Sequence, residues 1–439
     1  MTTLLEQTLA PLPSRLPPVE RRAVMPAGFA AAAMAAGIKA SGRPDLGIVS
    51  ASSGESTRGV PVAGIFTTNA LPAAPVRLSK KHLSATLRSG VGCYGWTRGL
   101  VSTSGSANAA TGEAGDVDQA EIAQHFASAL GTRPEQTLAL STGVIGTRLP
   151  VDAVAAGIDE LVSRLSSEDA ALAAVAEAIC TTDSRIKVAT VSLPVDAGRD
   201  RAPTSFRVSG FAKGVGMIHP RMATMLSVVL TDAPAEPVLL HEILVSAATR
   251  TWNQLSVDGD TSTNDTVFLL ASGAAGGTAV PAGSQAARAL AGGIEAVARD
   301  LARQQAADGE GATTLITCQV SGAVDEIAAR AIAREVVSSS LVKAAVHGRD
   351  PNWGRIAAAA GNAGMEIDPN RLRIAIAGSL VFDGPAGGPL GFDRAAVRAA
   401  MQAPELLIRL DLGAGDGIGE AFGCDLTEAY VVENSEYTT

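Results

Sequence analysis

The sequence predicts a mixed α/β fold of the α+β type, in which helices and strands follow one another without strict alternation. Two observations lead to this prediction. From Met25 onward, short runs of β-branched and apolar residues are interspersed with longer runs of helical periodicity. The chain has 46 glycines and only 3% aromatic residues, so its core must be built from Ala, Val, Leu and Ile. Its 439 residues suffice for two or three structural units, at ~100–200 residues each.

Helix signals occur in five segments. The first helix is expected to begin at Asp116, where acidic residues suit the positive end of the helix dipole, and to end at Gly131. A second is expected to begin at Ser167. The other three are expected within 236–252, within 284–307 and from about Val324 onward.

Strand signals are short β-branched runs bounded by Gly, Pro, Asp or Ser. One of them, LSVVLT over 226–231, follows a glycine-rich loop. The other predicted strands cover residues 187–195, 204–212, 314–322 and 371–378.

The charge balance and the cysteine spacing exclude several classes of protein. Lys and Arg number 35 against 44 Asp and Glu, a net charge of -9, and no basic run is present, which argues against nucleic-acid binding. The four cysteines form no CxxC pair, so we expect reduced thiols rather than disulfides or a zinc site. The start of the chain is not a secretory signal, and its most apolar run, residues 27–38, is shorter than the ~20 residues of a membrane span. We therefore expect a cytoplasmic protein.

Common catalytic motifs are absent from the sequence. No GxxxxGK[ST], HExxH or GxSxG pattern occurs, so a P-loop, a zincin and a nucleophile elbow are not indicated. The glycine series at residues 413, 415, 417 and 419 does not have the GxGxxG spacing of a Rossmann fingerprint. What remains are clusters of glycine and polar residues that a core does not need, each of which alone is consistent with a turn. They cover residues 141–143, 181–183, 213–217, 258–266, 308–311, 350–355 and 434–439.

Taken together and in this order, the clusters resemble the ornithine acetyltransferase family, also called bifunctional glutamate N-acetyltransferases. The resemblance extends from about residue 27 to residue 439. Its most specific pieces are AGIKASGRPDLG (36–47), GIFTTN (64–69), STGVIG (141–146), KGVGMIHPRMATML (213–226), VDGDTSTNDT (257–266), DPNWGRI (350–356) and the terminal NSEYTT. It implies a sandwich-like fold of the N-terminal-nucleophile type, with a smaller C-terminal α/β domain.

The resemblance also implies that the chain cuts itself between Ala223 and Thr224, and that Thr224 is the catalytic nucleophile. The chain would then consist of a flexible arm over 1–24, a first fragment over 25–223 and a second over 224–439. The chemistry is consistent, because the α-amine that cleavage creates has a reference pKa of ~7.7–8.0 and can accept the proton of the hydroxyl. Before cleavage, the same hydroxyl can attack the Ala223 carbonyl.

Cleavage and acyl transfer both pass through an oxyanion. The resemblance implies that the Thr142 hydroxyl and the Gly143 N–H stabilise it, and such a donor typically contributes ~2.7–4 kcal/mol. The resemblance also implies that Lys213 and Glu310 line the pocket. Their opposite charges suit the two charged groups of an N-acetylated amino acid, its carboxylate and its side-chain amine, and which group each residue contacts stays open. The other implied binding residues are Thr181, Thr224, Asn434 and Thr439, with the choice between Thr181 and its neighbour Thr182 left open.

Two polar segments are expected to serve as scaffold. Side-chain-to-backbone hydrogen bonds are expected from Asp258, Asp260, Asn264 and Asp265, and Asp350 is expected to pair with Arg355 in its own loop. The resemblance implies no metal.

The implied reaction is a ping-pong acetyl transfer in arginine biosynthesis. Acetyl moves from N-acetylornithine to Thr224, ornithine leaves, and glutamate then takes the acetyl group. The family needs no cofactor, although some members use acetyl-CoA as the donor, and its fragments assemble as α2β2 or larger. Two alternatives stay open: a paralogous acyltransferase or amidohydrolase for another N-acyl amino acid, since TSGSANAATG (103–112) departs from the family pattern, and a binding paralogue without catalysis.

Overall fold

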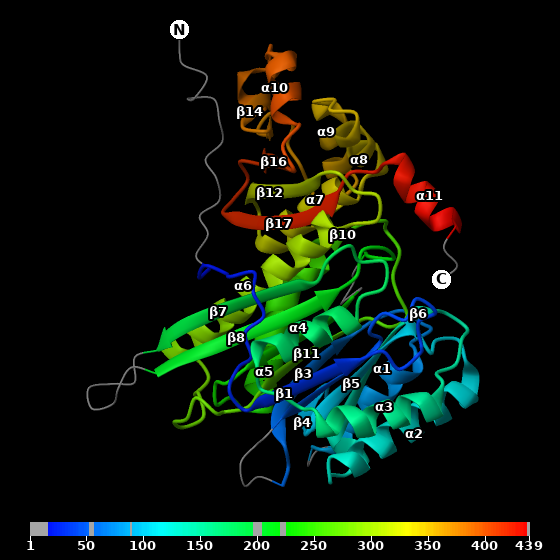
Figure 1. The fold of residues 1–439 in the computed structure, drawn as a ribbon. Helices are drawn as coiled ribbons and strands as arrows, with labels where there is room; N and C mark the ends of the chain where they lie inside the picture. Colours follow the sequence, from blue (N-terminus) through cyan, green and yellow to red (C-terminus); the bar gives the residue numbers. More distant parts are fainter. Residues whose placement is uncertain (1–15, 52–56, 88–89, 196–203, 220–224, 437–439) are drawn as a thin grey trace.

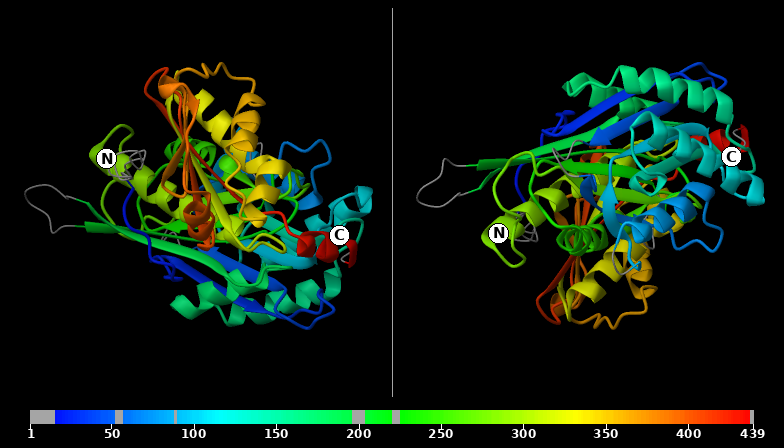
Figure 2. Two further views of the ribbon diagram at one scale, coloured as in Figure 1. Left: turned by 90° about the horizontal axis from the view of Figure 1, so that it is seen from above. Right: turned by 90° about the horizontal axis from the view of Figure 1, so that it is seen from below.

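The computed structural model describes residues 16–436 except 52–56, 88–89, 196–203 and 220–224 (Figure 1). Two β-sheets are stacked face to face, helices cover their outer faces, and a third sheet with its own helices forms a separate layer toward the C-terminus. Figures 1 and 2 show this C-terminal unit standing on one side of the stacked sheets. The sandwich and the smaller C-terminal α/β unit, both implied by the resemblance, are thereby confirmed.

The larger sheet of the sandwich has six strands in the order β4-β3-β11-β9-β8-β7. All six residues of β9 are buried, because alternate side chains enter the cores on the two faces of the sheet. Helices α5 and α6 cover the outer face. The bounds are β3 Val60–Phe66, β4 Tyr94–Thr97, β7 Lys187–Val195, β8 Thr204–Lys213, β9 Leu226–Thr231, β11 Thr266–Ala271, α5 Pro237–Arg250 and α6 Gln285–Ala307.

The second sheet of the sandwich has four strands in the order β1-β2-β5-β6. Its inner face packs against the six-stranded sheet together with apolar side chains of α1 and α4, and its outer face is covered by α2 and α3. The bounds are β1 Phe29–Met34, β2 Leu46–Ala51, β5 Gly99–Ser106, β6 Thr137–Val144, α1 Ala74–Ala85, α2 Gly112–Ala129, α3 Val151–Ser163 and α4 Asp169–Ala178.

The C-terminal unit is built on a seven-stranded mixed sheet in the order β10-β17-β12-β16-β13-β14-β15. Helices α7 to α10 pack on it or beside it, and α11 ends the described chain. The bounds are β10 Leu255–Ser256, β12 Leu315–Ala323, β13 Arg373–Ile376, β14 Ser379–Asp383, β15 Gly388–Pro389, β16 Glu405–Asp411, β17 Gly417–Cys424, α7 Glu326–Ser338, α8 Ser340–His347, α9 Trp353–Gly361, α10 Arg394–Ala400 and α11 Glu428–Glu436. Across the sandwich and the C-terminal unit, the described residues also form the 3₁₀ turns η2 Pro134–Gln136, η3 Trp252–Gln254 and η4 Gly384–Ala386.

The segment just before β1 corrects one expectation. Residues 1–24 were expected to form a flexible arm, but Glu20 exchanges two backbone hydrogen bonds with Thr190 of β7, at 2.8 and 2.9 Å. Arg21 pairs with Asp300 of α6 at 3.0 Å, and Val24 is buried. The described end of this segment is therefore packed on the six-stranded sheet, while residues 1–15 lie outside the described residues.

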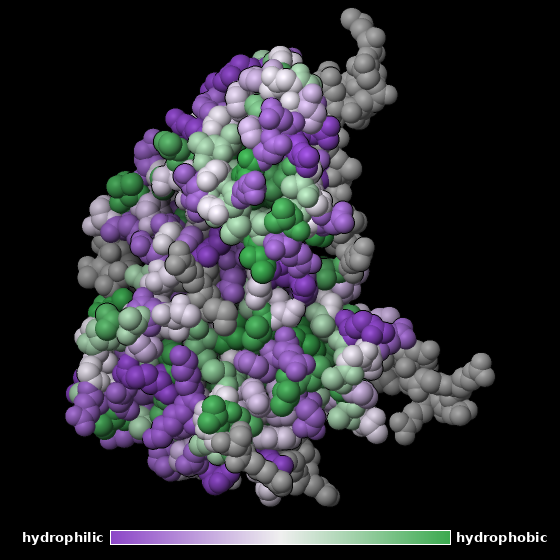
Figure 3. Space-filling model, turned by 180° about the vertical axis from the view of Figure 1, so that it is seen from behind, coloured by the Kyte–Doolittle hydropathy of each residue, from purple (hydrophilic) through white to green (hydrophobic). Residues whose placement is uncertain are grey.

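The surface of the described chain is mixed in hydropathy. On the face shown in Figure 3, hydrophobic residues occur in small groups between hydrophilic ones. Within the described ranges, no helix is long and apolar enough to cross a membrane. In the same part of the chain, no three His, Cys, Asp or Glu side chains gather in a way that would hold a metal ion.

Candidate active site

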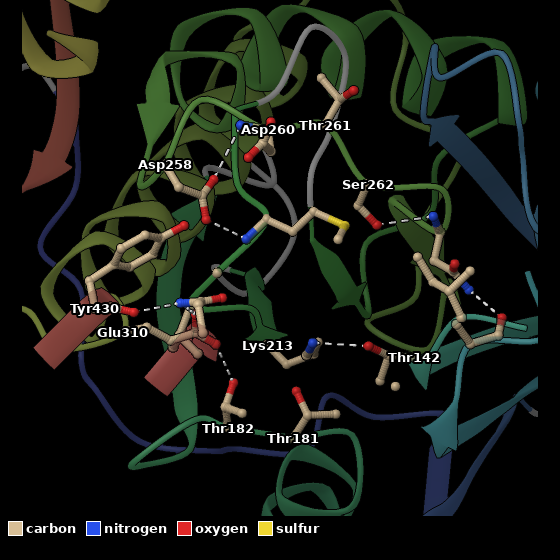
Figure 4. A pocket seen from close by; sticks show the side chains of 18 residues that line it. Thr142, Thr181, Thr182, Lys213, Asp258, Asp260, Thr261, Ser262, Glu310 and Tyr430 are labelled. Carbon is tan, nitrogen blue, oxygen red and sulfur yellow. Dashed lines mark hydrogen bonds between the residues drawn. The ribbon is translucent and has the colours of Figure 1, made fainter. Parts of the chain in front are cut away.

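A cavity of about 330 Å³ opens where the ends of both sandwich sheets meet the C-terminal helix α11 (Figure 4). Polar side chains from β6, β8, the loop after α4, the loop after α6 and α11 point into it. Its lining residues are Ala107, Thr142, Gly143, Ile145, Thr181, Thr182, Lys213, Val215, Gly216, Met217, Asp258, Asp260, Thr261, Ser262, Asn264, Glu310, Tyr430 and Asn434.

Thr142 and Gly143 lie at the end of β6, where this strand runs parallel to β5. Gly143 has a φ of +124°, and a Cβ at this position would collide with the backbone of Gly105. Only glycine fits here without strain, since L side chains rarely adopt this conformation. The close pairing of the two glycines therefore fixes the path of the backbone next to Thr142.

Lys213, the last residue of β8, lies beside Thr142 in the cavity. Its Nζ donates a hydrogen bond to Thr142 Oγ1 at 2.9 Å. An ammonium has no acceptor capacity, so the threonine oxygen is the acceptor and its own proton must point elsewhere. This contact leaves the Thr142 hydroxyl able to donate to a third group.

Glu310 forms the acidic side of the cavity together with residues from two other segments. Thr182 Oγ1 donates to Glu310 Oε1 at 2.9 Å, and Asn434 Nδ2 donates to Glu310 Oε2 at 2.9 Å. Both Thr181 and Thr182 line the cavity, and of the two Thr182 contacts the carboxylate. The carboxylate therefore joins the loop after α4 to the C-terminal helix.

Tyr430 closes the same end of the cavity, beside Asp258 and Glu310 (Figure 4). Burial raises the pKa of its phenol, and the nearby carboxylates of Asp258, Glu310 and Asp260 raise it further. The phenol therefore stays protonated near neutral pH and is available as a hydrogen-bond donor.

Asp258 acts as scaffold, as its segment predicted. Its carboxylate accepts backbone hydrogen bonds from Met217 at 2.5 Å, Ile218 at 2.8 Å and Asp260 at 3.2 Å. Burial raises the pKa of Asp258, although the same hydrogen bonds oppose the shift. Met217, which has a positive φ of 55° unusual for a non-glycine residue, is thereby held beside the cavity.

Asn264 is a second scaffold residue that the sequence predicted. Its Nδ2 donates to the carbonyl oxygens of Ala107 at 2.6 Å and Ser141 at 2.8 Å. These bonds tie the 258–266 loop to the residues that precede Thr142. Asn264 therefore fixes the loop to β6 and to the residue that follows β5 in the smaller sandwich sheet.

The expected pair of Asp350 and Arg355 is wrong. Asp350 instead accepts hydrogen bonds from Asn352 and Arg394, each at 2.9 Å. Arg355 lies in the first turn of α9, which Asn352 caps, and the helix directs its guanidinium to the carbonyl of Leu341 at 2.9 Å.

The chain also matches a known protein family. The family model described as "ArgJ family" matches residues 30–439, which is most of the chain.

The chain belongs to the ArgJ family.

This confirms the resemblance to the ornithine acetyltransferases. A relative named Arginine biosynthesis bifunctional protein ArgJ, from Synechococcus sp., is 44% identical over 423 aligned residues, with 94% of this chain and 96% of that protein covered. A protein of the same name from Thermus thermophilus is 44% identical over 416 residues, covering 94% and 99%. A crystal structure of Arginine biosynthesis bifunctional protein argJ from Bacillus halodurans is 39% identical and covers 49% of this chain and 100% of that chain, with a TM-score of 0.47.

In this ArgJ-family chain, most of the predicted site residues line one cavity. They are Thr142, Gly143, Thr181, Lys213, Glu310 and Asn434. Ala223, Thr224 and Thr439 lie outside the described residues. The described chain resumes at Met225, and the next residue, Leu226, is paired with Lys213 in the β8–β9 ladder.

The sequence reasoning missed several lining residues of this ArgJ-family site. Tyr430 was one, although it lies four residues before Asn434 and hence on the same face of α11. Met217, Thr261 and Ser262 were others, and nothing in their residue type distinguishes them from ordinary loop residues.

Proposed function

We propose that this protein is a self-processing acetyltransferase of arginine biosynthesis, which moves the acetyl group of N-acetylornithine to glutamate. Membership of the ArgJ family supports the proposal, as do relatives named Arginine biosynthesis bifunctional protein ArgJ that align with 94% of the chain. The observation that carries it is the single cavity that combines Thr142 and Gly143 with the oppositely charged Lys213 and Glu310.

In the first half-reaction, the Thr224 hydroxyl attacks the acetyl carbonyl of N-acetylornithine while the α-amine of Thr224 takes the hydroxyl proton. The resulting oxyanion accepts hydrogen bonds from the Gly143 N–H and the Thr142 hydroxyl. The Lys213 contact supports this role of Thr142, because it occupies the threonine oxygen as an acceptor and leaves the proton for the oxyanion. Collapse breaks the C–N bond, the amine of ornithine receives the proton, and acetyl-Thr224 remains.

In the second half-reaction, the amine of glutamate attacks the acetyl-Thr224 ester. The same oxyanion donors act and the C–O bond to Thr224 breaks. The proton that the glutamate amine loses passes through the α-amine of Thr224 to the Thr224 oxygen, and N-acetylglutamate leaves. Both substrates carry a carboxylate, and the cavity offers an ammonium at Lys213 and a carboxylate at Glu310 for groups of opposite charge. One site can therefore serve both substrates in turn.

Self-cleavage uses the same groups. The Thr224 hydroxyl attacks the Ala223 carbonyl, the peptide bond becomes an ester by an N-to-O acyl shift, and water hydrolyses the ester. No cofactor takes part in either reaction; acetyl-CoA is a candidate second acetyl donor. We also propose binding roles for Thr181 and Thr439.

The assembly and the compartment complete the proposal. Residues of both fragments line the cavity, since Thr142 and Lys213 precede the cut and Glu310 and Asn434 follow it, which supports fragments that stay together. We propose an α2β2 assembly of these fragments. A cytoplasmic location is supported by the four cysteines, all of which are free.

The first experiment determines the intact mass and the N-terminal sequences of the purified protein and of Thr224→Ala. We expect two fragments from the wild type, the second beginning at Thr224, and one uncut chain from the variant. The cut enzyme should then move labelled acetyl from N-acetylornithine to glutamate. A cut enzyme that transfers acyl groups only from another N-acyl amino acid would replace this function by the paralogue alternative. Acetate release that no amine acceptor affects would identify an amidohydrolase.

A further inference from the structure

A buried lysine that does not line the cavity connects the chain segments whose polar side chains do line it. Lys187, the first residue of β7, has a side chain with no exposed surface, and its Nζ donates to Asp183 Oδ1 and to Asp308 Oδ2, each at 2.6 Å. A third, longer bond runs to the carbonyl of Arg185 at 3.3 Å. All three ammonium protons are thus used inside the protein.

Asp183, which binds Lys187, also accepts hydrogen bonds from two backbone N–H groups next to cavity residues. Its Oδ2 accepts the N–H of Thr181 and its Oδ1 accepts the N–H of Gly214, each at 3.0 Å. Thr181 precedes Thr182, and Gly214 follows Lys213. Burial alone would raise the pKa of Asp183, but the ammonium groups of Lys187 and Lys213 lower it below its usual value, so the carboxylate is ionised at neutral pH.

Asp308, the other carboxylate that binds Lys187, belongs to the loop that carries Glu310. It lies directly after α6, two residues before Glu310, and accepts hydrogen bonds from the backbone N–H of Ser184 at 3.1 Å and from the Ser184 hydroxyl. Glu310 itself donates its N–H to Val215 at 2.9 Å, and a Cβ on Gly216 would collide with the Glu310 carboxylate. The loop after α6 therefore has little room to shift.

A role in stability alone would not require this arrangement. Burying three charges is costly, and apolar residues of similar volume commonly stabilise a core as well or better. Unlike apolar contacts, hydrogen bonds between charged groups have a preferred geometry, so each of them fixes the position of a particular atom. Here the fixed atoms belong to the segments of Thr182, Lys213 and Glu310, which surround the cavity in Figure 4.

We propose that Lys187, Asp183 and Asp308 are the positioning residues of the active site. The three, named here the Lys187 cluster, set the distances between Thr182, Lys213 and Glu310. None of the cluster residues lines the cavity, so they act through the residues they hold and do not touch the substrate. The test of this inference by acetyl-transfer kinetics rests on the proposed function, whereas the test by amide hydrogen exchange does not.

The main test compares Lys187→Met and Asp308→Asn with the wild type in the folded, cut enzyme. We expect kcat/KM for acetyl transfer to fall roughly 100-fold in Lys187→Met, since displacements of about 1 Å typically have this effect, with a higher KM for N-acetylornithine. Asp308→Asn keeps the volume of the side chain and should show a smaller loss. The double variant should lose about as much as Lys187→Met alone, because the cluster acts as a unit.

Asp232→Asn is the matched control. Asp232 is also a buried carboxylate that accepts a backbone hydrogen bond, from Arg207 at 2.7 Å, but it lies at the opposite end of the β8–β9 pair from Lys213. This variant should lower the melting temperature and leave kcat and KM unchanged.

Amide hydrogen exchange provides a readout that does not depend on turnover. Peptides containing Thr181 and Gly214 should lose protection in Lys187→Met and in Asp308→Asn, but not in Asp232→Asn. Wild-type protection in both cluster variants, or wild-type kcat and KM in a folded and cut Lys187→Met, would overturn the inference. If Lys187→Met does not fold, the same two criteria apply to Asp308→Asn. A wild-type enzyme that transfers no acetyl group would reject the proposed function, and the exchange data would then decide this inference alone.

Discussion

Thr142 is held by a hydrogen bond from Lys213 that leaves its own proton available to a reacting group. We predict that Thr142→Ala lowers kcat by about 10²–10³-fold, the loss typical of one oxyanion donor, with a much smaller change in KM. Steady-state kinetics of acetyl transfer measures this. Thr142→Ser keeps the hydroxyl and should retain most of the activity. An alanine variant with wild-type kcat would remove Thr142 from the oxyanion site.

Asp265 gives a prediction about pH and stability. It is buried, its Oδ2 has no hydrogen-bond partner among the described residues, and burial raises its pKa well above the usual value. Between the usual and the raised pKa, the folded state keeps a proton that the unfolded chain has released. The contribution of Asp265 to stability therefore falls as the pH rises through this window.

Asp265→Asn should consequently raise the melting temperature at pH 7, and the gain should shrink as the pH falls toward 4. Thermal unfolding of the variant and the wild type at both pH values is the measurement. The contrast is Asp118→Asn, whose buried carboxylate accepts a hydrogen bond from Arg148 Nε at 2.7 Å and which should lose stability at pH 7. A lower melting temperature for Asp265→Asn at pH 7 would contradict the prediction.

At the scale of single residues, the sequence identified the polar side chains of the cavity better than their partners. The resemblance to the family was enough to pick out Thr142, Lys213 and Glu310. It did not reveal that Thr182 and Asn434 meet on Glu310, because their contact brings together residues 124 or more positions apart in the chain. Such contacts are set by the tertiary fold, which local pattern does not encode.

At the scale of elements, β6 ends with Gly143 in a positive-φ conformation that only glycine adopts without strain. We predict that Gly143→Ala abolishes most of the activity, because the added Cβ collides with the Gly105 backbone and moves the N–H that should face the oxyanion. The loss should be roughly 100-fold or more in kcat, as for removal of a donor.

Gly146→Ala is the control for this variant. Gly146 also has a positive φ, of 85°, but no atom lies within 4 Å of a Cβ added there. It should lower the melting temperature through backbone strain and leave kcat near the wild-type value. Equal losses of kcat in the two variants would mean that strain, and not the position of the Gly143 N–H, explains the effect.

Element boundaries were predicted well where periodicity was strong. Residues 187–195 and 226–231 are strands with the predicted bounds, and the helix expected within 284–307 is α6. The helix expected from Asp116 instead begins at Gly112. Glycine normally disfavours a helix, but a Cβ on Gly115 would clash with Thr111 and Asn108, so close packing explains this glycine. A packing requirement of this kind is not visible in a single sequence.

At the scale of the whole molecule, the six-stranded sheet draws its strands from both sides of the proposed cut. Strands β9 and β11, which follow residue 223, lie between β8 and β3, which precede it. We predict that the two fragments elute as one complex from size-exclusion chromatography at neutral pH and separate only in denaturant. Denaturing gels of the eluted peak show both bands. Separation without denaturant would contradict the prediction.

The general architecture followed from the sequence through its resemblance to a family, and only partly through its composition. Alternating strand and helix runs gave the mixed class, but they did not show that two sheets stack face to face. A sheet that is covered on both faces has strands whose side chains are apolar on both faces. Such a strand, β9 for example, is a continuous hydrophobic run in the sequence, which does not show what packs against either face. The expected extent of the arm was wrong because the residues from Glu20 to Val24 carry no periodic pattern, although the backbone of Glu20 pairs with β7.

The packing of strands from both sides of the proposed cut also has a consequence for folding, because only a chain that has folded could cut itself. In the proposed reaction, Thr224 acts together with Thr142 and Gly143, which lie in the four-stranded sheet, whereas the strand that follows the cut lies in the six-stranded sheet. A chain in which the two sheets have not yet packed together would therefore have no means of cutting itself. The proportion of cut chains in a crude cell extract would therefore count the molecules that have once reached the native state. A destabilising substitution far from the cavity would then be recognisable on a gel, as uncut polypeptide, before any enzyme assay is run.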